Sequence, residues 1–112
     1  MSHMLDPLHE VACKIYAELK ADKVTLSSEG WALITVGKPT SEVDVVGVLK
    51  QNGFHVTDCD PSERDPLLFK DCFGAFSGYI QGKRVLGLIY YDDDKRKVNE
   101  IKIFYQPGGG QA

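Results

Sequence analysis

The chain has 112 residues and a mass of 12.4 kDa, which suits one domain and leaves no room for a second. It is 43% hydrophobic, and its 13 basic and 16 acidic residues give a formal net charge of −3. This acidic balance argues against a nucleic-acid or anionic-membrane partner, because both attract a cationic surface. The longest apolar run, residues 85–91, is far shorter than the ~18–20 residues that span a bilayer.

Both ends of the chain are expected to lie outside the folded domain. Residues 1–4 are typical of a cloning remnant, and residues 107–112 are glycine-rich and predict a disordered tail. A single domain is therefore expected over residues 5–106.

The cysteines indicate a cellular compartment. Cys13, Cys59 and Cys72 are an odd number without paired spacing, and the N-terminus lacks the pattern of a secretory signal. We therefore expect unpaired thiols and a cytoplasmic location, since disulfides are rare in a reducing compartment.

The first predicted element is an amphipathic helix within residues 5–22. Asp6 can accept a backbone N–H at the N-cap, and Pro7 suits the first helical position, where its missing donor does no harm. Apolar residues then recur at steps of three and four, with charged residues between them.

A hairpin and a second helix are expected next. Residues 24–27 and 31–36 are rich in β-branched and aromatic residues around a turn centred on Gly30. Ser41 resembles an N-cap, and Gly53 fits the position just after a helix end. The valines between them lower the helix propensity, so a strand is the alternative for this segment.

The second half of the chain predicts strands joined by short turns. Residues 60–71 interrupt them with a charged excursion around a short apolar group. The predicted strands are residues 54–59, 73–80, 84–91 and 98–106.

The order α-β-β-α-β-β-β-β with short connections predicts an α+β fold. We expect a two-layer sandwich in which a largely antiparallel sheet carries both helices on one face. Gly74 and Gly78 fall on the same strand face as Phe76 and Ile80, which predicts close approach of a helix on that side. The other face of the sheet is free, and function is expected on it.

One group of residues could carry chemistry. His55, Cys59 and Cys72 could bind zinc, which prefers nitrogen and sulfur ligands, but the spacing lacks the close pairs typical of zinc sites. Cys72 could alternatively act as a nucleophile with His55 as its base. Buried cysteine is more often a plain small hydrophobe, so we expect neither a metal nor another cofactor and favour a protein without catalytic activity.

The excursion is also acidic. Its carboxylates include Asp60, Glu63 and Asp65, and their spacing does not match a calcium-binding loop. A solvated loop is the plain interpretation. The functional interpretation is a surface that steers a basic partner by its negative potential.

The leading functional hypothesis is a small interaction domain of the inhibitor, immunity or adaptor kind. It would bind a protein partner, or a second copy as a homodimer, through the free sheet face and the acidic loop. Aromatic residues in the last three strands are the predicted anchors, because such residues dominate interface energetics. These anchors are Tyr79, Tyr91 and Phe104.

The runner-up is a small-molecule-binding domain with a pocket between the helices and the sheet. Tyr16, Trp31 and Phe76 would line that pocket. An enzyme built on Cys72 and His55 ranks third.

Overall fold

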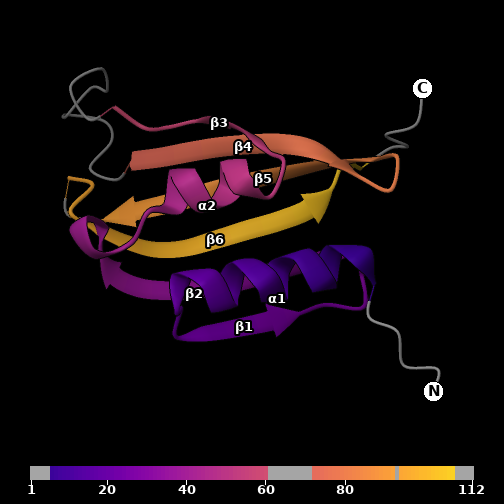
Figure 1. Cartoon of the computed structure of the whole chain (residues 1–112), viewed down its shortest axis with the longest axis horizontal. Coiled ribbons are helices and arrows are strands. Elements are labelled where there is room, and N and C mark those ends of the chain that lie inside the picture. The colour runs from indigo at the N-terminus through magenta and orange to yellow at the C-terminus, as the bar shows by residue number, and fades with distance from the viewer. Residues whose placement is uncertain (1–5, 61–71, 93, 108–112) are drawn as a thin grey trace.

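The computed structural model of the chain describes residues 6–60, 72–92 and 94–107. They form two helices and six strands in the predicted order, together with a short 3-10 turn over Thr40–Glu42 (Figure 1). The helices and strands are α1 (Pro7–Leu19), β1 (Lys23–Leu26), β2 (Trp31–Pro39), α2 (Val45–Gln51), β3 (His55–Thr57), β4 (Cys72–Ile80), β5 (Lys83–Asp92) and β6 (Lys97–Tyr105).

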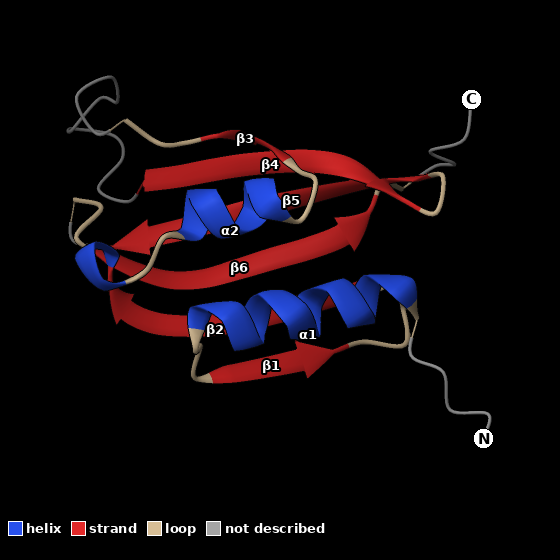
Figure 2. Cartoon of the chain, in the orientation of Figure 1, coloured by secondary structure: helices blue, strands red, loops and turns tan. Residues whose placement is uncertain are grey.

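The strands form one antiparallel sheet in the order β1-β2-β6-β5-β4-β3. The last strand in the chain, β6, therefore lies in the interior of the sheet, between β2 and β5. Both helices lie on the same face (Figure 2), which confirms the predicted α+β sandwich. None of the described elements covers the other face, which we call the open face.

Helix α1 begins and ends where its sequence predicts. The Asp6 carboxylate accepts the N–H of Leu8 at 2.8 Å, and Pro7 occupies the first turn. Lys20 adopts a left-handed conformation and ends the helix. The buried stripe packed on the sheet consists of Leu8, Ala12, Ile15 and Leu19.

The segment after β2 is a helix, which settles the choice between helix and strand. The predicted N-cap was wrong by one turn, because Ser41 lies in the 3-10 turn and the Asp44 carboxylate accepts the N–H of Gly47. Helix α2 buries Val45 and Leu49, and this burial outweighs the low helix propensity of its valines. Gly53 has a φ of +90° just after the helix end, as predicted.

The core fills the space between the helices and the sheet. Alternate residues of each strand point into it, including Ile34 in β2, Ile101 in β6 and Ile89 in β5. The glycines of β4 and β5 allow rings to approach closely: a Cβ at Gly78 would lie 2.8 Å from the Phe54 ring. The close approach at Gly78 therefore occurs on the predicted side, but it comes from Phe54 in the connection between α2 and β3 and not from a helix, which the sequence predicted.

Several segments named in the sequence analysis lie outside the described residues. Most of the charged excursion, residues 61–71, lies outside the described residues, as does residue 93. Residues 1–4 and most of the glycine-rich tail lie outside them as well. Within the described residues, no helix has the length and hydropathy needed to cross a bilayer.

Candidate functional site: the open face

The open face presents aromatic and aliphatic side chains in rows that run across the sheet. In the first row, Trp31 pairs with Phe104, and Phe104 pairs with Leu86. Leu86 pairs with Ser77, which pairs with His55 at the edge. Since directly opposite residues in a sheet are neighbours on one face, this row forms a continuous surface over five strands.

Two further rows lie alongside the first. The second contains Leu33, Lys102, Leu88, Ala75 and Thr57. The third contains Thr35, Glu100, Tyr90 and Phe73. Most of the large apolar side chains in these rows are only half-buried.

Two aromatic side chains on this face are strongly exposed. Phe73 is 52% and Tyr79 is 65% exposed, and both come from β4. Phe73 packs edge-on against Tyr90 at a centroid distance of 5.3 Å, and the Arg84 guanidinium lies 5.3 Å from the Tyr79 ring centre. Such exposed rings are the usual anchors of a binding surface.

Cationic side chains lie among the aromatic ones. The Lys102 ammonium lies 5.7 Å from the Trp31 ring centre and 6.0 Å from that of Phe104. These distances suit cation–π contacts, which hold the lysine over the rings. Lys102 and Arg84 therefore place positive charge among or beside the apolar side chains of the first two rows, whereas Glu100 lies in the third row.

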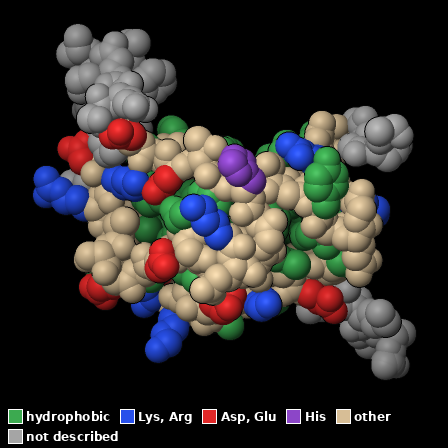
Figure 3. Space-filling view, turned by 45° about the horizontal axis from the view of Figure 1, so that its top comes forward, with side chains coloured by type: hydrophobic (Ala, Val, Ile, Leu, Met, Phe, Trp, Pro, Cys, Tyr) green, Lys and Arg blue, Asp and Glu red, His purple; other side chains and the backbone are tan. Residues whose placement is uncertain are grey.

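The helix-covered side differs from the open face. Figure 3 shows that side, tilted so that one edge comes forward, with acidic and basic side chains intermingled over it. Apolar side chains are visible there only in small areas between polar ones. Mixed charge of this kind is ordinary for a solvated surface.

A hollow of about 330 Å³ lies on the open face, between the β6 side and the β3 edge. Its depth follows from the side chains of β4, where small Ala75 and Ser77 stand between large Phe73 and Tyr79. The residues that line it include His55, Ala75, Ser77, Arg84, Leu86 and Phe104.

The structure separates the three predicted anchors. Tyr79 and Phe104 lie on the open face as expected, but the placement of Tyr91 was wrong. Tyr91 is 2% exposed and lies under the helices, because it shares the inward alternation of Val85 and Ile89. Its neighbour Tyr90 points to the open face instead, and alternation counted from Val85 would have distinguished the two tyrosines.

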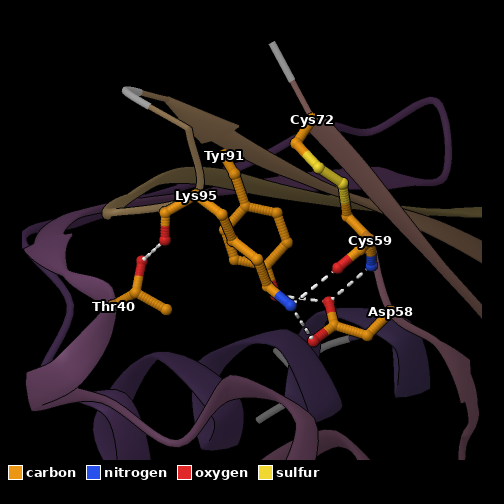
Figure 4. Close-up of a disulfide and its surroundings, with 6 residues drawn as sticks. All are labelled: Thr40, Asp58, Cys59, Cys72, Tyr91 and Lys95. Atoms are coloured by element: carbon orange, nitrogen blue, oxygen red, sulfur yellow. Dashed lines mark hydrogen bonds and ion pairs between the residues drawn. A yellow bond between two sulfur atoms is a disulfide. The ribbon is translucent and has the colours of Figure 1, made fainter. Parts of the chain in front are cut away.

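Tyr91 belongs to a hydrogen-bonded network with Asp58 and Lys95 (Figure 4). The Tyr91 hydroxyl donates to the Asp58 carboxylate at 2.7 Å, and the Lys95 ammonium donates to the same carboxylate at 2.8 Å. Lys95 also donates to the Cys59 carbonyl oxygen at 2.7 Å. The network fastens the β5–β6 turn to the segment that follows β3.

The network changes the protonation of its members. Burial raises the pKa of Asp58, but hydrogen bonds from Lys95, Tyr91 and the Cys59 N–H lower it by more, so the pKa lies below 3.8. Burial, together with the adjacent Asp58 carboxylate, raises the pKa of Tyr91 above its ordinary value. Asp58 is therefore an ionised structural group at neutral pH.

The expectation of three unpaired thiols was wrong. Cys59 and Cys72 form a disulfide (Figure 4), with their Cα atoms 5.9 Å apart, which is the usual separation for such a bond. Cys13 is free. The expectation of a reducing compartment depended on unpaired cysteines and loses that support. A spacing of 13 residues gave no sign that the excursion returns to its starting point.

The disulfide also removes the basis for the proposed cysteine chemistry. Both candidate thiols are bonded to each other, and Cys72 is buried under the helices while His55 lies on the open face. The candidate zinc ligands are therefore not gathered. Within the described residues, no three His, Cys, Asp or Glu side chains form a cluster that could hold a metal ion.

The other predicted site residues are only partly placed. Asp60 is exposed just after the disulfide cysteine, whereas Glu63 and Asp65 lie outside the described residues. The residues of the runner-up pocket do not converge: Trp31 lies on the open face and Phe76 in the core on the opposite side.

A second hydrogen bond joins the two ends of the domain. The Tyr105 hydroxyl donates to the Asp6 carboxylate at 2.7 Å, and the same oxygen accepts the N–H of Leu8. Burial and this carboxylate raise the pKa of Tyr105 to about 12. The N-cap of α1 is thereby fastened to the end of β6.

Comparisons with protein-family models, with curated proteins and with solved structures found no match.

Proposed function

We propose that this chain is a small, non-catalytic interaction domain of the inhibitor, immunity or adaptor kind, and that it binds a protein partner through the open face. The observation that carries the proposal is the exposure of Phe73 and Tyr79 on β4, on the same face as the half-buried Phe104 of β6, a face that none of the described elements covers. Exposed aromatic side chains on an uncovered sheet face support an interaction site, because large exposed apolar groups are costly in water unless a partner covers them.

The charges on the open face predict the charge of the partner surface that would match it. Lys102 and Arg84 lie among the aromatic side chains, so the matching surface is apolar and carries carboxylates opposite these two groups. A second copy laid face to face would present the same Lys102 and Arg84, with Glu100 as the one carboxylate among the described residues of the three rows, instead of an acidic surface. We therefore favour a different, acidic protein over a homodimer.

The acidic excursion has a separate part in the proposal. Asp60, Glu63 and Asp65 follow the disulfide cysteine Cys59 in the sequence and would steer a partner that carries basic groups beside its acidic patch. Tyr91 has no part in binding, because it lies under the helices.

The test begins with the wild-type protein immobilised and used to capture partners, followed by purification of each captured protein. The affinity of each is then measured for wild type and for Tyr79→Ala and Phe104→Ala. Truncating an anchor weakens binding by about 2 kcal/mol or more, which is roughly thirtyfold. The matched control is Lys14→Ala on the exposed side of α1, which should leave the affinity unchanged.

Two outcomes contradict the proposal. A captured partner that binds both anchor variants as tightly as wild type does not use the open face. A dimer in native mass spectrometry that dissociates on Tyr79→Ala would assign the face to a second copy instead of an acidic partner.

A further inference from the structure

The hollow on the open face has the composition of a ligand site. Its volume of about 330 Å³ lies at the lower end of the ~300–1,000 Å³ range of small-molecule pockets. Leu86, Leu88 and Ala75 give it an apolar lining, and Phe104 forms the wall towards β6. A molecule of aromatic-ring size would bury its apolar surface there.

The hollow is also lined by polar side chains, which are basic or neutral. Arg84 contributes a permanent positive charge, and His55, Ser77 and Thr57 contribute further polar groups towards the β3 edge. None of the described residues that line the hollow is acidic. Arg84 contacts the Tyr79 ring but makes no ion pair within the described part of the chain.

From these observations we propose that the hollow binds a small organic carboxylate, in which an apolar ring lies on Leu86 and Leu88 and the carboxylate pairs with Arg84. A guanidinium recognises a carboxylate through two parallel hydrogen bonds, and the adjacent Tyr79 ring restricts its position. The neighbouring hollow beside Trp31 contains both Glu29 and Lys102, so it lacks this selectivity for anions. The inference does not require a protein partner.

The test is an NMR titration of isotope-labelled protein with 3-phenylpropionate and, in parallel, with its neutral amide. We expect saturable shifts at the backbone amides of Ser77, Leu86 and Leu88. The acid should bind about fivefold more tightly than the amide, as an exposed ion pair of ~1 kcal/mol implies.

Three variants test whether Arg84 pairs with the carboxylate and whether the ligand lies in the hollow. Arg84→Gln should abolish the preference for the acid while the amide still binds. Lys83→Gln is the matched control. Lys83 directly precedes Arg84 in β5, but its ammonium lies over the Tyr105 ring and the residue does not line the hollow. Ala75→Leu should block both ligands by filling the hollow from an exposed position, without changing its charge.

The proposal is overturned by any of three results: no saturable shift, equal affinity for acid and amide, or binding that survives Ala75→Leu. A thermal unfolding curve for each variant shows whether it is folded. Because the probe is used without a partner, failure here leaves the protein-binding proposal untouched, and failure to find a partner leaves this one untouched.

Discussion

The Tyr91 hydroxyl and the Asp58 carboxylate are joined by a hydrogen bond of 2.7 Å, although 33 residues separate them in the chain. The bond connects the inward side of β5 to the segment that leaves β3. Lys95 joins the same carboxylate from the β5–β6 turn. The exposed Asp58 carboxylate therefore accepts from two groups on β5 and its following turn, which ties the segment after β3 to the far end of β5.

Tyr91→Phe tests this bond with the ring left in place. The variant loses one donor to a charged acceptor, so we expect it to lower the free energy of unfolding by about 1–2 kcal/mol. Urea denaturation measures the change. Tyr105→Phe is the control, since it removes a similar bond to Asp6 at an exposed position and should have a smaller effect. Equal effects of the two variants would contradict a special role for the partly buried bond.

Acid titration tests the ionisation of Asp58. Its folded pKa lies below the ordinary value of 3.8, so its contribution to stability is present above that pH and is lost as the pH falls through the folded pKa. Asp58→Asn should therefore be less stable than wild type at neutral pH, and the difference should shrink below pH 3.8. Denaturant unfolding at a series of pH values provides the measurement.

Asp6→Asn is the comparison for the acid titration. Burial raises the pKa of Asp6, but hydrogen bonds from Tyr105 and Leu8 lower it by more, so this variant should show the same trend. A stability difference for Asp58→Asn that stays constant on acidification would show that the carboxylate charge contributes nothing.

The disulfide is tested by removing both of its cysteines. Replacing Cys59 and Cys72 with alanine reopens a loop closed by residues 13 apart, which should lower the free energy of unfolding by about 3 kcal/mol. Cys13→Ser is the control and should have little effect. Alkylation of the denatured protein should label one thiol before reduction and three after it, and three labelled thiols before reduction would contradict the bond.

Gly87→Ala tests the packing of one ring on the sheet. The Phe76 ring lies directly against Gly87, its partner across β4 and β5, and a Cβ there would overlap the ring. We expect a loss of about 1–3 kcal/mol in the free energy of unfolding from overpacking. Adding Phe76→Leu should recover part of the loss, and strictly additive effects of the two changes would show that they do not interact.

Local signals in the chain predicted most of the secondary structure. Asp6 and Pro7 marked the start of α1, and Gly53 the end of α2, because caps depend on a few adjacent residues. The short connections and the order of elements were enough for the α+β class. The position of β6 between β2 and β5 depends on pairing between distant segments, which local patterns do not report.

The site could be predicted less well than the fold. The alternation of side chains along a strand was enough to place Tyr79 and Phe104 on the open face. Tyr91 was misplaced because it was grouped with the other aromatic residues, although it is an even number of residues from Val85 and so shares its buried face. The disulfide was not predicted because it depends on the spatial separation of Cys59 and Cys72, which local patterns do not report. The alternation of large and small residues that gives the hollow its depth is visible in β4 itself, but the positions of Leu86 and Phe104 beside it are known only from the strand register.

The hydrogen bond between Asp6 and Tyr105 joins residues 99 apart in the chain and leaves both ends of the domain on one side of the molecule (Figure 1). A short glycine linker between these ends could therefore close the backbone into a ring. New termini could then be opened at the tight turn of Gln81 and Gly82 between β4 and β5. Such a circular permutant would change the order in which the strands are synthesised, while leaving every neighbour in the sheet as it is.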